Sequence, residues 1–219
     1  KELSALWELA ALRSNNPAIG LALPELIAPS IFDVVAYSMM SSENLLASLE
    51  RLVRFLRIVT NAARMELIPE RDGYWLSHEI FSDKNCTIPR QRFDFNMIAI
   101  VTFCRWVSKR EINPLVVEFT HPQPLDCKPY RDSFRCTLRF NAKRNQMLIA
   151  HRDLQRALPT ANTVLAEMHD SYAHTCMNQM RSQQVSQLAR ELILKNLHLG
   201  DPSKGTVANA LCLSERTLQ

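Results

Sequence analysis

The carboxyl-terminal segment, residues 201–219, restricts the fold more than any other part of the sequence. It reads DPSKGTVANALCLSERTLQ. Ser203 is placed to cap a helix by accepting a hydrogen bond from a backbone N–H group of the first turn. Val207, Ala208 and Leu211 then fall on one face of that helix, and the small Ala208 allows a second helix to approach closely. The pattern predicts the first helix of a helix-turn-helix.

A turn and a second helix follow in the same segment. Cys212 and Leu213 form the turn. Ser214 is placed to cap the next helix, and Leu218 returns to pack on Leu211. The remaining side chains of this second helix are polar and face outward, a surface that suits the major groove of DNA.

Residues 207–219, Val-Ala-x-x-Leu-x-Leu-Ser-x-Arg-Thr-Leu-Gln, resemble the first helix-turn-helix of AraC/XylS-type transcription regulators. The resemblance implies base contacts by Arg216 and Gln219, and arginine suits guanine as glutamine suits adenine. It also implies a glycine in the turn, where this chain has Cys212. A non-glycine residue at positive φ costs roughly 1 kcal/mol. The predicted DNA-binding residues are Ser214, Glu215, Arg216, Thr217 and Gln219.

Four segments of the remaining chain resemble a second known domain. They are residues 41–56 (SSENLLASLERLVRFL), 116–124 (VVEFTHPQP), 130–134 (YRDSF) and 140–154 (FNAKRNQMLIAHRDL). In this order they are similar to the arabinose-binding-like amino-terminal domain of one branch of AraC-type regulators. The resemblance implies an effector-sensing and dimerisation domain tethered to the DNA-binding domain. The effectors of this family vary in chemistry, so the resemblance names no ligand.

Helical periodicity covers much of the first part of the chain. The clearest helix, residues 45–59, has Ser42 or Asn44 as its cap and a stripe of leucines on one side. Residues 31–40 are apolar enough for a buried helix, with a strand as the alternative. In residues 161–181 we expect an inward face of Val164, Leu165, Met168, Tyr172 and Cys176. Further helices are expected at 1–13, 17–23, 93–109, 151–158 and from 185 onward.

Strand patterns occur between these helices. Asp72-Gly73 favours a tight turn, and the flanking residues 65–68 and 74–80 predict a β-hairpin around it. Residues 115–119 are β-branched and predict a strand. We expect residues 134–140 and 146–150 to pair with each other as a further two strands.

The elements together predict an α+β fold. Residues 1–180 form a helix-rich effector domain with a small β-sheet, and residues 181–219 form the start of an all-α helix-turn-helix domain. The boundary is the polar run NQMRSQQ at 178–184, which lacks glycine and proline and therefore suits a helical joint. Lys1 lies inside a helical pattern and Gln219 inside a helix, so we expect the natural chain to extend beyond both.

Composition excludes several classes of function. The net charge of +4 and pI near 8.8 fit a nucleic-acid partner and equally fit an ordinary, slightly basic surface. The six cysteines contain no Cys-x-x-Cys pair and the six histidines no i, i+4 pair, so no metal site or cofactor is expected. With four glycines, no phosphate loop and no nucleophile elbow, no enzyme is predicted.

Candidate effector contacts are aromatic residues with polar tips and one arginine. An apolar pocket with a few polar groups suits a small ligand, and an arginine turned inward from the predicted helix 45–59 suits an acidic one. For each residue singly, ordinary core packing or a solvated surface is the alternative. The predicted residues are Tyr37, Phe55, Arg57, Trp75 and His78.

The predicted function is a ligand-responsive, DNA-binding transcription regulator of the cytoplasm. Its expected partners are promoter or operator DNA, an unidentified small-molecule effector, a second copy of the chain in a homodimer, and RNA polymerase. No apolar run reaches the length of a membrane span and no signal peptide is visible. The alternative is a ligand-binding or dimerisation module whose helical tail docks on protein, because a short helical hairpin need not bind DNA.

Overall fold

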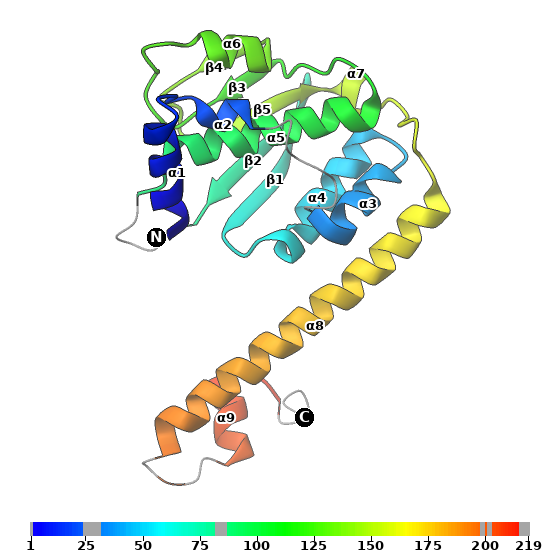
Figure 1. Cartoon of the computed structure of the whole chain (residues 1–219). Helices are drawn as coiled ribbons and strands as arrows, with labels where there is room; N and C mark the ends of the chain where they lie inside the picture. Colours follow the sequence, from blue (N-terminus) through cyan, green and yellow to red (C-terminus); the bar gives the residue numbers. More distant parts are fainter. Residues whose placement is uncertain (1, 24–31, 82–86, 198–199, 201–202, 215–219) are drawn as a thin grey trace. The chain divides into compact units, whose positions relative to one another are not determined.

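The computed structural model describes residues 2–23, 32–81, 87–197, 200 and 203–214. These residues confirm the predicted α+β fold (Figure 1). The described helices are α1 (Glu2–Arg13), α2 (Ile19–Ala22), α3 (Asp33–Met40), α4 (Leu45–Val59), α5 (Arg90–Ser108), α6 (Lys128–Phe134), α7 (His151–Leu154), α8 (Thr163–Asn196) and α9 (Lys204–Ala210). The strands are β1 (Ala63–Glu70), β2 (Gly73–Ile80), β3 (Val116–Glu118), β4 (Thr137–Arg139) and β5 (Asn145–Ala150).

The chain divides into two compact units, Lys1–Asp170 and Ser171–Gln219. Helix α8 begins in the first unit and continues in the second. The polar run at 178–184 is therefore helical, as the absence of glycine and proline suggested. The predicted domain boundary after residue 180 falls within the same helix.

The predicted hairpin is present as β1 and β2. The two strands pair antiparallel, and Glu70 lies opposite Gly73, so the turn residues are Arg71 and Asp72. Gly73 has a packing reason: a Cβ atom there would lie 1.9 Å from the carbonyl oxygen of Ile149 on the neighbouring strand β5. Glycine thus permits the close pairing of β2 with β5.

The five strands lie in the order β1-β2-β5-β3-β4, with β3 and β4 parallel and the other neighbours antiparallel. The predicted pairing of residues 134–140 with 146–150 is wrong, because β3 lies between β4 and β5. Val117 of β3 is fully buried, which suits a central strand. Thr137 and Arg139 of β4 are exposed, which suits an edge. Phe134 belongs to the unpredicted helix α6 and is buried there.

Helices cover the sheet in the first unit. Helix α5 crosses the sheet, with α1 and α2 beside it, and α3 and α4 pack together near β1 (Figure 1). Residues 33–40 are helical, which resolves the alternative left open by their sequence. Asn44 caps α4 by accepting a hydrogen bond from the backbone N–H of Ala47 at 2.9 Å.

A buried carboxylate ties α5 to α6 and to the loop after β3. Asp94 is fully buried and accepts a hydrogen bond of 2.7 Å from the Tyr130 hydroxyl. The Nε2 atom of His121 lies 3.2 Å from its other oxygen. Burial, together with the charge of Asp94, raises the pKa of Tyr130, so the phenol remains a donor at neutral pH.

The inward face predicted for residues 161–181 is wrong. Val164, Leu165, Met168 and Tyr172 are exposed, and Cys176 is half-buried. The face of α8 that contacts the first unit presents small and polar groups, with Ala166 buried and His169 and Asp170 hydrogen-bonded to α3. Because that contact is polar, hydrophobic periodicity could not identify it.

The helix predicted after Ser203 is present as α9 in the second unit. Ser203 caps α9 by accepting a hydrogen bond from the backbone N–H of Thr206, and Val207 and Ala208 are buried. After α9 the Leu213 N–H donates to the Ala208 carbonyl and the Cys212 N–H to the Asn209 carbonyl. These two bonds form a Schellman motif with Cys212 in its left-handed position, at φ 54°.

Replacing Cys212 by glycine is expected to stabilise this turn by about 1 kcal/mol, because only glycine adopts the left-handed region without steric cost. The measurement is hydrogen exchange of the backbone amides of α9 and Leu213, which should slow about fivefold. Cys212→Ala is the matched control, since alanine has the same penalty and should exchange like the wild type. Equal rates for the glycine and alanine variants would contradict the assignment.

Candidate functional site

The first unit contains a cavity of about 300 Å³ between its helices and the β1–β2 hairpin. Its wall is formed by α1, α3, α4, α5 and both strands of the hairpin, together with Phe32 before α3 and Thr60 after α4. The lining residues are Leu3, Trp7, Phe32, Met39, Leu52, Leu56, Val59, Thr60, Ala63, Met65, His78, Arg92, Phe95, Asn96, Ala99, Ile100 and Phe103.

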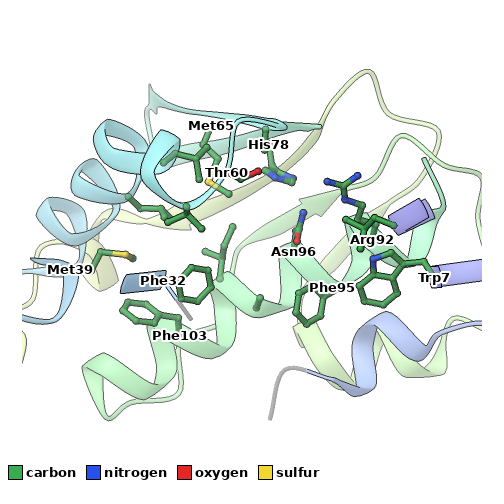
Figure 2. Close-up of a pocket in the computed structure, with 17 residues that line it drawn as sticks. Trp7, Phe32, Met39, Thr60, Met65, His78, Arg92, Phe95, Asn96 and Phe103 are labelled. Carbon is green, nitrogen blue, oxygen red and sulfur yellow. The ribbon is translucent and has the colours of Figure 1, made fainter. Parts of the chain in front are cut away.

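Most of this wall is apolar. Phe32, Met39 and Phe103 lie together at one side in Figure 2. Trp7 packs against Phe95 at the other side, with ring centroids 5.4 Å apart. A cavity with these walls offers dispersion contacts and the removal of water, which favour a ligand with an apolar body.

Four polar side chains, which we call the polar end, interrupt the apolar wall: Thr60, His78, Arg92 and Asn96. In Figure 2 Thr60 lies beside His78, Arg92 points towards His78, and Asn96 lies below the gap between those two side chains. They come from the end of α4, from β2 and from α5. No Asp or Glu occurs among the described residues that line the cavity. The polar end therefore carries a positive charge with hydrogen-bond donors around it.

His78 is the most deeply buried member of the polar end, with 3% of its surface exposed. Within the described part of the chain its Nδ1 atom has no hydrogen-bond partner. Burial lowers the pKa of His78 from 6.5 to about 4, and the positive charge of Arg92 acts in the same direction. The ring is therefore neutral at pH 7, with one nitrogen as donor and the other as acceptor.

The structure brings one of the five predicted effector residues, His78, to the cavity wall. Phe55 is fully buried on α4 but does not line the cavity, and Arg57 is exposed on the same helix. Tyr37 is half-exposed with its ring 6.0 Å from that of His169. Trp75 is half-buried and lies three residues before His78 on β2, so its side chain is on the opposite face of the sheet.

Sequence reasoning missed Arg92 and Asn96. The two residues are four apart at the start of α5 and lie on one side of it with Ala99 and Phe103. The available signal was a pair of polar residues in line with the apolar stripe of an otherwise strongly hydrophobic helix. Such a pair faces the core only if a cavity accepts it, and periodicity alone does not reveal the cavity.

Helix α8 is held to α3 and α4 beside this cavity. Asp170 accepts hydrogen bonds from the Arg51 Nε atom at 3.0 Å and from the Ser38 hydroxyl, and both members of the ion pair are 18% exposed. The Ser41 hydroxyl lies 3.0 Å from the His169 ring nitrogen. Ser38 and Arg51 precede Met39 and Leu52, which line the cavity. The same two helices therefore form the cavity wall and the attachment of α8.

Of the predicted DNA-binding residues, the structure describes Ser214, which is exposed. Glu215, Arg216, Thr217 and Gln219 lie outside the described residues. Across the described part of the chain no cluster of three metal-ligating side chains occurs. None of the described helices combines the length and apolar character that crossing a membrane requires.

The chain matches a known domain over most of its length. A family model, the arabinose-binding domain of AraC transcription regulators, N-terminal, matches residues 1–158. The crystal structure of the transcriptional regulator CdpR from Pseudomonas aeruginosa is similar in fold, with a TM-score of 0.65 and 17% sequence identity over 98% of this chain and 70% of that chain. No curated protein matches the chain in sequence.

The buried His78 is expected to make stability pH-dependent. In the unfolded chain the ring takes up a proton near pH 6.5, but in the folded chain only near pH 4. Between these values the unfolded state binds more protons, so stability is lost as the pH falls. Between pH 7 and pH 5 the free energy of unfolding should drop by about 2 kcal/mol because of this group.

Urea denaturation at both pH values measures this loss. His78→Gln should lack that part of the pH dependence, and His174→Gln, a matched change at an exposed position of α8, controls for the loss of an imidazole. An equal drop in the wild type and in His78→Gln would show that His78 is not the group responsible.

Proposed function

The chain belongs to the AraC transcription regulators through their N-terminal arabinose-binding domain, and we propose that it is a ligand-responsive regulator whose effector occupies the cavity of the first unit. The observation that carries the proposal is the shared use of α3 and α4. Met39 and Leu52 line the cavity, and the residues before them, Ser38 and Arg51, hold Asp170 of α8. A ligand that moves these helices changes the attachment of α8.

The response follows from differential binding. A ligand shifts an equilibrium between two arrangements only if it binds one of them more tightly. In this proposal the two arrangements differ in how α3 and α4 hold the first turns of α8. Because α8 continues as one helix into the second unit, a change at Asp170 is carried along a helix and not along a flexible linker.

DNA recognition belongs to the second unit in this proposal. The capped helix α9 and the Schellman turn at Cys212 support it, because a short capped helix followed by a tight turn is how the first half of a helix-turn-helix is built. Arg216 and Gln219 contact bases, and Ser214 and Thr217 contact phosphate or cap the helix; Glu215 completes the outward face. The protein acts in the cytoplasm on promoter DNA, as a homodimer, in contact with RNA polymerase.

A second candidate is a module whose helical tail docks on another protein. Exposed apolar side chains on the second-unit part of α8, Leu188, Ile193 and Leu194, favour it. Salt dependence separates the two candidates. Contacts to several phosphates release counterions, so DNA affinity falls steeply with salt, whereas docking through apolar side chains does not.

Enlarging a cavity residue is expected to change DNA affinity through α8. Ala99→Leu adds volume to the cavity wall and so mimics a bound ligand. Its affinity for an operator selected by the wild-type protein should change about threefold or more, and Asp170→Asn should abolish that change. The double-mutant cycle should give a coupling energy of about 0.5–3 kcal/mol. Ala5→Leu, at an exposed position of α1, is the matched control. Additive effects would contradict the coupling.

Arg216→Ala should weaken operator binding by about 1–3 kcal/mol and relax the choice of base, if the contact to guanine is bidentate. A gel-shift titration of the full-length protein against operator and scrambled DNA measures both effects. Arg190→Ala removes the same charge from the exposed surface of α8 and should affect both DNAs alike. Unchanged operator affinity in Arg216→Ala would refute the base contact.

A further inference from the structure

We propose that the cavity binds a small carboxylic acid with an apolar body, its carboxylate at the polar end and its body against the apolar wall. This inference rests on the proposed function and deepens it by naming the chemical class of the effector. It is carried by three properties of the described lining residues: their charge, their hydrogen-bonding capacity and the distribution of polar groups.

Charge favours an anion over a cation. Arg92 is the one ionised side chain among the described lining residues at pH 7, since His78 is neutral there and no carboxylate lines the wall. Charges interact more strongly in a partly dry cavity than in water. An acid gains from Arg92, whereas an amine of the same shape is repelled by it. A guanidinium also matches a carboxylate in shape, because two parallel N–H groups meet two oxygens.

The hydrogen-bonding groups of the polar end are mainly donors. Arg92 offers only donors, Asn96 two on its amide nitrogen, and the neutral ring of His78 one. A carboxylate accepts only, with room for about four hydrogen bonds. The Nδ1 atom of the buried His78 has no partner among the described residues, which indicates a ring whose hydrogen bonding a ligand would complete. Thr60 adds a hydroxyl that donates or accepts.

Apart from the indole N–H of Trp7, the other described lining residues have no polar side-chain group, which restricts the rest of the ligand. Beyond the polar end the described lining is aliphatic and aromatic, with Phe32, Met39, Leu52, Leu56 and Phe103 on the side formed by α3, α4 and α5. A sugar has hydroxyl groups on nearly every carbon, and those placed against this wall would lose water without gaining partners. The volume of about 300 Å³ lies at the lower end for ligand sites, so the acid is small.

Direct binding to the full chain tests the class. The probes are octanoate and 3-phenylpropanoate, each compared with its primary amide and with the amine of the same skeleton. Trp7 lines the cavity and reports occupancy through its fluorescence, with calorimetry as the second readout. At least one acid should bind about tenfold or more tightly than its amide and its amine, as expected for the loss of charge-assisted hydrogen bonds.

Variants at the polar end locate the carboxylate. Arg92→Gln should lower the affinity for the acid by about tenfold and leave that for the amide nearly unchanged, because glutamine keeps donors but not charge. Arg92→Lys should restore part of the loss. Arg54→Gln makes the same change at an exposed position of α4 and should leave both ligands unaffected. An unaltered unfolding curve of Arg92→Gln ensures that lost binding is not lost folding.

Two outcomes overturn the inference: no acid of the panel binds the wild type, or the amides or amines bind as tightly as the acids. Neither result touches the Ala99→Leu and Asp170→Asn series, which needs no ligand and tests the proposed function separately. Conversely, acids that bind in an Arg92-dependent manner would keep the site even if that series showed no change in DNA affinity.

Discussion

The ion pair between Arg51 and Asp170 is the interaction on which the functional interpretation depends. Both side chains are 18% exposed, so the pair lies where water screens charge less than at an open surface. Asp170 also accepts a hydrogen bond from Ser38, and Arg51 donates to the Ser42 hydroxyl. The geometry of this network is fixed by the packing of α3 against α4. A change in that packing therefore alters the hydrogen bonds that hold the first turns of α8.

The cavity is costly to maintain, and that cost is informative. The imidazole of the buried His78 lies in a largely apolar wall, and its Nδ1 atom has no hydrogen-bond partner among the described residues. An apolar filling of the same space would contribute more to folding stability, since a buried polar group without partners costs about 1–3 kcal/mol. Such local departures from optimal packing are typical of binding sites. The Asp94 network is the contrasting case, because Tyr130 and His121 supply partners to its buried carboxylate.

The sequence predicted best what depends on neighbouring residues. The cap of α9 at Ser203 follows from local backbone chemistry and is present, and so is the left-handed turn residue Cys212, which the resemblance implied. The position of β3 between β4 and β5 was missed, because strand order depends on burial across the sheet and not on any single strand. The exposed apolar stripe of α8, with Val164 and Met168, was predicted to face inward, because the side of the helix that packs cannot be identified when its contacts are polar. Arg92 was missed because an inward arginine is recognisable only when the cavity around it is known.

The continuity of α8 bears on the kind of signal that the proposed function requires. A flexible linker sets only the effective concentration of the unit that it tethers, because the orientation of a random coil is lost over a few residues. A helix of 34 residues without glycine or proline retains that direction along its length. A helix in a protein gains most of its stability from tertiary contacts. Asp170 and His169 supply such contacts near the start of α8. In the proposed function, the attachment that stabilises the first turns of α8 is also the one that a ligand of the first unit would alter.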